Sequence, residues 1–307
     1  MQRPIGSRTV TVQPEPRTPG PIALDDAWDL VVAGDNLPVL RDLPDEAFRL
    51  VYLDPPFNSG RVQTRQSITH IRSDAGTRIG FQGRSYEVVK GRALSYRDRF
   101  DDYWGFLEPR IAELHRLLAA DGVLVLHLDA GEVHYARLAL DALFGAEQFV
   151  AEIVWAYDYG ARSTKRWPAK HDNLLVYAKD ARRFRFDGAA AAAERFTAPG
   201  LSTESDRDAG ALPSDVWWHT IVSTTGREKT GYPTQKPIGV LRRLIGALTE
   251  PGDLVLDPFA GSGTAGDAAR RLERRFVMID EHPDAVEVMA KRFGDGMLGR
   301  RVRYLAA

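Results

Sequence analysis

Residues 251–280 read PGDLVLDPFAGSGTAGDAARRLERRFVMID, and this run predicts a strand, a glycine turn, a helix and a second strand in succession. Residues 254–256 are apolar, as in the buried strands of a parallel sheet, and Asp257 ends them. Residues 264–272 are predicted as a helix, and residues 275–279 are predicted as the next strand. Units of this kind build an open parallel sheet with helices on both faces. The sequence therefore predicts an α/β, doubly wound fold.

The turn inside this run has the composition of a cofactor loop. Gly261 and Gly263 permit backbone angles and close approaches that a side chain would block. Asp280 ends the second strand, at a spacing where an acid commonly accepts hydrogen bonds from ribose hydroxyls. The loop lacks the full three-glycine dinucleotide fingerprint, and an ordinary strand-to-helix turn is the alternative. The combination of strand, glycines, helix and acid favours a cofactor that contains a ribose.

A second strand end carries different chemistry. Residues 50–60 read LVYLDPPFNSG, in which Asp54 follows an apolar strand and so lies at the sheet edge where ligands bind. Pro55 and Pro56 fix the backbone and leave the Pro55 carbonyl pointing in a set direction. Phe57 offers an aromatic face for stacking. A plain turn after a strand is the alternative interpretation of these residues.

The four residues suit the methylation of an amino group on a flat ring. The lone pair of an exocyclic amine on adenine or cytosine is delocalised into the ring, which makes the nitrogen a poor nucleophile. Two acceptors on the amine hydrogens, the Asp54 carboxylate and the Pro55 carbonyl, favour the tetrahedral geometry that attack on a methyl group requires. The base has to leave the duplex, because a stacked and paired amine cannot reach a methyl donor.

The pairing of LDPPF at 53–57 with LDPFAGSGT at 256–264 resembles the amino-group DNA methyltransferases that use S-adenosylmethionine. The order of the two motifs resembles the β class of that family, and the resemblance extends from Val32 to Phe293. It implies a Rossmann-like methyltransferase sheet with circularly permuted motif order and recognition-loop insertions. It further implies S-adenosylmethionine as the cofactor and double-stranded DNA as the partner, with a homodimer and a companion restriction endonuclease as further candidate partners.

The resemblance also implies further cofactor-binding positions. The Gly-Asp pair that ends at Asp35 is expected near the cofactor adenine. In YPTQKP, residues 232–237, the hydrogen-bonding side chains of Thr234 and Gln235 and the cation of Lys236 are expected to hold the amino-acid end. A polar turn before a helix-starting proline is the alternative for this segment. The complete expected cofactor set is Asp35, Thr234, Gln235, Lys236, Asp257, Phe259, Gly261, Gly263 and Asp280.

Adenine is the preferred target, because Asp54 leads the tetrapeptide whereas the resembling cytosine methyltransferases more often carry Ser there. Cytosine N4 methylation is the first alternative, followed by an RNA or protein amide methyltransferase and a DNA-binding protein without catalysis. From a different class, a nicotinamide-dependent oxidoreductase would explain the glycine turn and Asp280. It would leave residues 54–57 unexplained.

Two basic segments are candidate DNA contacts, because arginine suits bidentate contacts to phosphate and guanine. Residues 58–99 follow the catalytic tetrapeptide, show little periodicity and are interpreted as a long basic loop beside the active site. Residues 179–231 are interpreted as a target-recognition segment in which at least one of Trp217 and Trp218 anchors the chain to the core. Solvated charged surface is the alternative for both segments. The expected contacts are Arg61, Arg65, Arg72, Arg78, Arg84, Arg182, Arg183 and Arg227.

The chain has 307 residues, of which 44% are hydrophobic, and this is enough for a sizeable core. Residues 1–21 are expected to be a tail or surface arm. Residues 22–178 form the catalytic half of the domain, and residues 232–307 form its cofactor-binding half. Residues 302–305 are expected to add a final edge strand.

Composition narrows the function classes further. The absence of cysteine excludes disulfides and thiolate metal sites, and disfavours cytosine carbon-5 methylation through a cysteine adduct. A net charge of −1 means that DNA binding must come from local patches. No metal site is predicted, and His115 and His127 are interpreted as structural. The lack of a long apolar run and of a signal-like N-terminus indicates no membrane partner and a cytoplasmic, nucleoid-associated protein.

Overall fold

The computed structural model describes residues 13–58, 61–72, 78–79, 85–98, 102–158, 162–193, 214–223, 226, 228–294 and 300–307. Between residues 61 and 98 only the course of the backbone is described. Among all the residues that the structure describes, no helix has the length and apolar character needed to cross a membrane.

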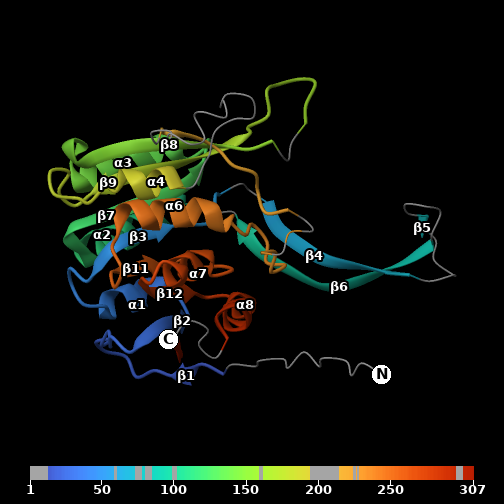
Figure 1. Cartoon of the computed structure of the whole chain (residues 1–307), viewed down its shortest axis with the longest axis horizontal. Coiled ribbons are helices and arrows are strands. Elements are labelled where there is room, and N and C mark those ends of the chain that lie inside the picture. Colours follow the sequence, from blue (N-terminus) through green and yellow to red (C-terminus); the bar gives the residue numbers. More distant parts are fainter. Residues whose placement is uncertain are drawn as a thin grey trace.

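A ten-stranded sheet forms the centre of the molecule, in the order β1-β13-β2-β12-β11-β3-β7-β9-β8-β10 (Figure 1). Neighbouring strands are parallel, except that β9 runs antiparallel to both β7 and β8. The strands are β1 (Glu15–Pro16), β2 (Trp28–Ala33), β3 (Phe48–Leu53), β7 (Leu118–Asp129), β8 (Phe149–Ala156), β9 (His171–Ala178), β10 (Val216–Trp218), β11 (Leu254–Asp257), β12 (Arg275–Asp280) and β13 (Arg301–Ala306).

Helices cover both faces of this sheet, and each face has its own hydrophobic core. One face carries α1 (Asn36–Asp42), α2 (Tyr103–Leu117) and α3 (Val133–Phe144). The other carries α4 (Gly188–Ala193), α6 (Ile238–Leu248), α7 (Thr264–Arg271) and α8 (Pro283–Phe293). A short 3-10 helix, η2 (Ala146–Gln148), precedes β8. Successive side chains of β3 alternate between the two cores, as a pleated strand requires. The doubly wound α/β fold predicted from the sequence is confirmed.

The pairing of β3 with β11 joins the two halves of the chain. Leu50 lies opposite Val255 and Val51 opposite Leu256, in parallel register. On the far side of β11, β12 pairs with it and with β2. Because these four strands are parallel, their carboxyl ends meet at one edge of the sheet, where ligands bind in open α/β folds. Both sequence motifs therefore end at the same edge.

The prediction of a long basic loop at residues 58–99 is wrong. The described backbone of this segment forms a three-stranded antiparallel sheet. β4 (Arg61–Arg72) pairs with β6 (Ser85–Asp98), and β5 (Arg78–Ile79) pairs with the start of β6. Figure 1 shows this hairpin extending away from the body of the molecule. Strand patterns are normally recognised by an apolar face that alternates with a polar one. The sequence of residues 58–99 shows little periodicity of this kind, so the strands were not predicted.

Two smaller predictions also change. The strand at residues 302–305 is not the edge of the sheet, because β1 pairs with β13 and takes the edge position. Residues 15–16 of the predicted arm form that edge strand, while residues 1–12 lie outside the described part. The alanine-rich stretch of the predicted recognition segment is the short helix α4, which packs on α6.

The turn before α7 generates a prediction about stability. Gly263 has a φ of +71°, and a Cβ there would lie 2.7 Å from Cγ of Met289 and 2.9 Å from Cζ of Phe293. Gly263→Ala is therefore expected to lower the free energy of unfolding by at least about 2 kcal/mol, through left-handed strain and overpacking together. Gly252→Ala is the matched control, because Gly252 has a φ of +90° and a Cβ added there would meet nothing within 4 Å. Equal losses for the two variants in urea denaturation would refute the packing contribution.

Candidate active site

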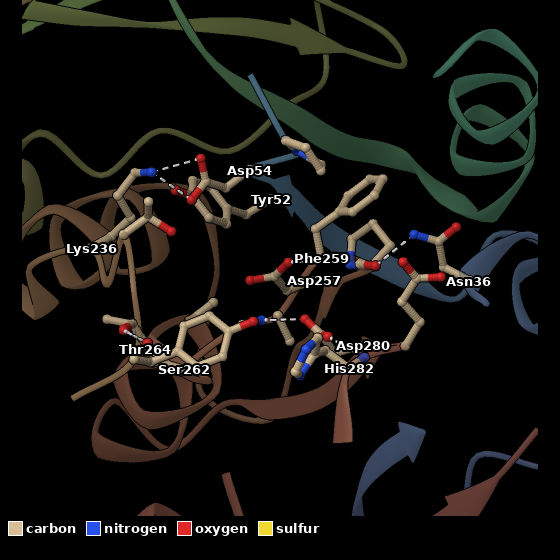
Figure 2. Close-up of a pocket in the computed structure, with 18 of the residues that line it drawn as sticks. Asn36, Tyr52, Asp54, Lys236, Asp257, Phe259, Ser262, Thr264, Asp280 and His282 are labelled. Atoms are coloured by element: carbon tan, nitrogen blue, oxygen red, sulfur yellow. Dashed lines mark hydrogen bonds and ion pairs between the residues drawn. The ribbon is translucent and has the colours of Figure 1, made fainter. Parts of the chain in front are cut away.

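A cavity of about 410 Å³ opens at the carboxyl edge of the sheet (Figure 2). Its wall comes from four strand ends and from the turn before α6. Asp257 ends β11, Asp280 ends β12, and Asp54 directly follows β3. The lining also includes Asp35 and Asn36 after β2. The predicted catalytic acid and the predicted cofactor loop therefore share one cavity.

The glycine turn is held by hydrogen bonds to the neighbouring strand. Ala260 donates its backbone N–H to the carbonyl of Ile279 at 3.0 Å, and Gly261 donates to Oδ2 of Asp280 at 2.7 Å. Gly261 has a φ of +50°, and a Cβ there would lie 3.1 Å from Cε1 of Tyr232. Only glycine fits here without strain, because the turn is left-handed and closes against an aromatic ring.

Asp280 is a buried carboxyl that anchors this turn. Its Oδ1 accepts a second hydrogen bond from the backbone N–H of His282, at 2.8 Å. Burial raises the pKa of Asp280 to about 6, although these two backbone donors oppose the shift. Asp257 is buried more deeply and accepts from the N–H of Phe259 at 3.0 Å. Burial, with Asp54 and Asp280 nearby, raises its pKa well above the usual range.

A buried arginine organises the wall beyond β2. Arg110 of α2 donates from Nε to Oδ1 of Asn36 at 2.6 Å and from a terminal nitrogen to Oδ1 of Asp35 at 2.9 Å. Asn36 in turn donates to the carbonyl of Pro258 at 2.8 Å, which ties the wall to the strand end of β11. The guanidinium carbon of Arg110 also lies 3.8 Å from the ring centroid of Phe106. Asp35, predicted near the cofactor adenine, therefore lines the cavity in a fixed orientation.

Sequence reasoning missed Arg110 and Asn36. The signal was present, because residue 110 lies on the same helical face as the buried Leu107, Ile111 and Leu114. A charged residue on a buried face has to be paired with polar groups. That requirement could have identified a polar cluster beneath the cavity.

The YPTQKP segment provides the opposite wall, but its side chains play different parts. The side-chain amide of Gln235 is used within the turn: Oε1 accepts from Thr230, and Nε2 donates to the carbonyl of Glu228. Thr234 adopts a left-handed φ of +55° and donates to the carbonyl of Pro233. These contacts shape the turn. Pro237 is the residue before the helix, which begins at Ile238.

Lys236 contacts two residues of the predicted catalytic tetrapeptide. Its Nζ is 2.6 Å from Oδ2 and 2.8 Å from Oδ1 of Asp54 (Figure 2). The same Nζ lies 4.7 Å from the ring centroid of Phe57. The sequence predicted this lysine as the partner of a cofactor carboxylate. In the structure its partner is the carboxylate of Asp54, the predicted catalytic acid.

His127 of β7 lies behind Asp54 in a buried hydrogen-bonded chain. Its Nδ1 is 2.8 Å from the hydroxyl of Tyr52 and 3.9 Å from Oδ1 of Asp54. Its Nε2 is 3.3 Å from Oδ2 of Asp172, whose Oδ1 accepts from the hydroxyl of Tyr157 at 3.0 Å. Burial raises the pKa of Asp172, but the hydrogen bonds and charge of its partners outweigh that effect and leave it lowered. His127 is buried and hydrogen-bonded, as expected of a structural histidine, and it packs behind Asp54.

The remaining predicted residues belong to the catalytic motif, the cofactor motif and the tryptophan pair. Pro56 lines the cavity, while Pro55 and Phe57 lie outside its lining; Phe57 packs 5.8 Å from the His127 ring. Phe259 lines the cavity, whereas Gly263 does not and instead packs against α8. Trp217 is buried and anchors β10, as expected for at least one of the two tryptophans.

The predicted DNA contacts are only partly described. Arg61, Arg65 and Arg72 lie on β4 and Arg78 on β5, whereas Arg84 and Arg227 lie outside the described residues. Arg182 and Arg183 follow β9, whose carboxyl end pairs with the start of β7. They therefore lie at the edge of the sheet opposite the cavity. The predicted DNA role of these two arginines has no geometric support.

Comparison with known proteins agrees with this site. Residues 48–292 match a family model described as DNA methylase. The chain is 29% identical over 270 residues to the DNA adenine methyltransferase YhdJ of Escherichia coli K12, covering 85% of this chain and 81% of that protein. Two solved structures share the fold. The PvuII DNA methyltransferase, cytosine-N4-specific, has a TM-score of 0.60 with 18% identity and 88% coverage of both chains. The M1.HpyAVI–SAM complex has a TM-score of 0.54 with 20% identity, covering 86% of this chain and 99% of that one.

Proposed function

The chain belongs to the family of amino-group DNA methylases, and we propose that it transfers a methyl group from S-adenosylmethionine to the N6 amine of an adenine flipped out of duplex DNA. The observation that carries the proposal is the shared cavity: Asp54 and the glycine turn at Gly261 line the same space. A nicotinamide-dependent oxidoreductase has no support in the family match. A homodimer and a companion nuclease remain predictions.

The cavity suits S-adenosylmethionine in its charge and shape. The cofactor supplies an electrophilic methyl group on a sulfonium, which is cationic. Five carboxyl side chains line the cavity, those of Asp35, Asp54, Asp257, Asp280 and Glu281, and a nearby cation stabilises their ionised forms. Asp280 would hold the ribose hydroxyls, and the left-handed turn at Gly261 lets the backbone approach the ligand. One structural neighbour was solved as a SAM complex, which is consistent with this assignment.

The catalytic step rests on the residues that follow β3. The Asp54 carboxylate and the Pro55 carbonyl would accept the two amine hydrogens, which favours the tetrahedral nitrogen and orients its lone pair. The methylated amine carries an extra proton, and Asp54 is a nearby acceptor for it. Phe57 would stack on the flipped base, in the manner of the aromatic side chains that hold extruded bases.

Lys236 would hold Asp54 in place for this step. A carboxylate has about four acceptor positions. The ammonium of Lys236 uses one on each oxygen, which leaves acceptor capacity for the base amine. Because the pair is largely buried, the ion pair fixes the carboxylate more firmly than an exposed one would.

The choice of adenine over cytosine rests on Asp54 as the leading residue of the tetrapeptide. YhdJ, named an adenine methyltransferase, supports it, whereas the PvuII neighbour is named as cytosine-N4-specific. Cytosine N4 is therefore the second candidate. Both reactions need the same acceptors, so the product decides between them.

The first prediction concerns the product and Asp54. DNA from an unmethylated host, incubated with the protein and S-adenosylmethionine, is expected to yield N6-methyldeoxyadenosine on nucleoside mass spectrometry. Asp54→Asn removes the anionic acceptor and is expected to lower kcat by about 10²- to 10⁴-fold. Cofactor affinity, measured by calorimetry, should be retained. Wild-type turnover in the variant would overturn the role of Asp54, and N4-methylcytosine would establish the second candidate.

The second prediction separates the two roles of Lys236. Lys236→Met removes a charged hydrogen bond to Asp54 and is expected to lower kcat by roughly 10- to 100-fold. The dissociation constant of the cofactor should change little. Lys291→Met is the matched control, because Lys291 pairs with Glu287 on the exposed surface of α8. Weaker cofactor binding with a normal kcat would instead indicate that Lys236 holds the cofactor carboxylate.

The third prediction is a pH dependence of cofactor binding. Ribose hydroxyls donate to the ionised form of Asp280, whose pKa is about 6, so affinity is expected to fall as the pH drops below about 6. The contribution of Asp280 to folding stability changes with pH in the opposite direction to cofactor affinity. A folded-state pKa raised above the usual 3.8 makes this group's contribution to stability fall as the pH rises from about 4 to about 6.

Calorimetry between about pH 5 and pH 8 tests this dependence. Asp280→Asn should bind the cofactor more weakly and lose the pH dependence. His282 carries an imidazole ring two residues from Asp280, so His282→Asn is the control. Asparagine can still accept the N–H of Asp284 as the helix cap. If the pH dependence vanished in His282→Asn and persisted in Asp280→Asn, the histidine would be responsible.

A further inference from the structure

A short basic segment between β8 and β9 presents a tryptophan entirely to solvent. Residues 162–170, here called the Trp167 arm, read RSTKRWPAK and contain four basic residues and no acidic one. Trp167 is 98% exposed, and every residue from 162 to 167 is exposed. Tryptophan is highly buried on average in folded proteins. An indole held in water among cations is the composition of a surface that stacks on bases and contacts phosphates.

The local geometry holds the arm outward. The hydroxyl of Ser163 accepts the backbone N–H groups of Lys165 and Arg166 at 3.1 and 3.2 Å. Pro168 restricts the backbone of the preceding Trp167 to extended conformations. At the base of the arm, the N–H of Tyr157 donates to the carbonyl of Lys170 at 2.9 Å. The indole is therefore displayed on a constrained stem.

The sheet places this arm beside the catalytic wall. β8 and β3 both run parallel to β7, since β9 is antiparallel to β7 and to β8. Their carboxyl ends therefore lie at the same edge, so the arm leaves the sheet at the edge where the cavity opens. The base of the arm connects to the catalytic acid through Tyr157, Asp172 and His127, which lies 3.9 Å from Asp54.

The hairpin of β4 and β6 leaves the same edge from the end of β3. Figure 1 shows both the hairpin and the arm projecting from the same side of the sheet. Along this edge the cavity spans the ends of β2, β12, β11 and β3, and the arm leaves from β8, beyond β7 and β9. A duplex received at this edge would meet both projections.

We propose that the Trp167 arm is a DNA-binding element in which the indole of Trp167 stacks on a base next to the target, while Lys165 and Arg166 contact phosphates. The proposal rests on the DNA methyltransferase function proposed above. Flipping the target base exposes the faces of its neighbours, and an aromatic ring can cover such a face in any sequence. The net charge of −1 gives no general attraction to DNA, so a local cluster of cations has to provide it. The exposed position of Trp167 is explained by this partner.

The experiment begins with wild-type protein and DNA from an unmethylated host. Labelled methyl incorporation into DNA tests the proposed function by itself, and its absence would refute that function. Sequencing of modified bases then identifies a site, from which a fluorescent duplex is made for anisotropy measurements.

Trp167→Ala is expected to raise both the dissociation constant of this duplex and its KM by roughly 5- to 100-fold, with cofactor affinity unchanged. Trp167→Phe should retain most of the affinity, since phenylalanine also stacks. Quenching of tryptophan fluorescence by DNA should decrease in Trp167→Phe. The matched control is Phe186→Ala. Phe186 is 56% exposed and follows β9 at the opposite edge of the sheet, so its removal should leave DNA binding unchanged.

The cations are tested separately. The double variant Lys165→Gln, Arg166→Gln should reduce the slope of the logarithm of affinity against the logarithm of salt concentration by about 2. The proposal is overturned if Trp167→Ala binds and methylates the duplex as wild type does. It is also overturned if Trp167→Ala alters only the oligomeric state on size-exclusion chromatography, because the arm would then be a protein contact.

Discussion

The parallel pairing of β3 with β11 is the constraint on which the site depends. Leu50 and Val51 are opposite Val255 and Leu256, although the two strands lie about 200 residues apart along the chain. Parallel register fixes which strand ends are neighbours, so Asp54 and Asp257 emerge side by side. A slip by one residue would exchange the two cores, because alternate side chains of β3 belong to opposite faces. The hydrophobic pattern of both cores thus fixes the position of Asp54, the proposed catalytic acid.

The carboxyls gathered at this edge disfavour one another's ionised forms, because they are buried and close together. Burial raises the pKa of Asp257 and of Asp280. For Asp257 the negative charges of Asp54 and Asp280 raise the pKa further. Two cations in the walls of the cavity balance part of this negative charge: Lys236 pairs with Asp54, and Arg110 pairs with Asp35. A cationic ligand would balance more of the negative charge, which is why the charge of a sulfonium suits this cavity. The same carboxyls accept hydrogen bonds from backbone N–H groups of the glycine turn, so structure and binding use one set of atoms.

The fold and the main site residues could be predicted because they depend on local sequence. Short apolar runs, glycines at a turn and an acid at a strand end are each visible within a few residues, and Asp54, Asp257, Gly261 and Asp280 all line the cavity. The partner of Lys236 could not be predicted, since it depends on how two distant segments meet. Gly263 lies in the cofactor motif, yet what requires glycine there is the closeness of Met289 and Phe293 of α8. A motif identifies the position that must be glycine but does not say which neighbour excludes a side chain.

The basic hairpin and the Trp167 arm were harder to interpret for a single reason. Sequence patterns report burial, whereas residues 162–167 of the arm are exposed and the backbone of the hairpin extends away from the body of the molecule. The arm lies at residues 162–170, outside both segments that sequence composition singled out, and Trp167 resembles a core residue until its 98% exposure is known. Conversely, Arg182 and Arg183 have the right composition and lie at the wrong edge, because β9 is antiparallel to its neighbours. Strand direction therefore separates the basic residues that can meet a duplex over the cavity from those that composition alone would include.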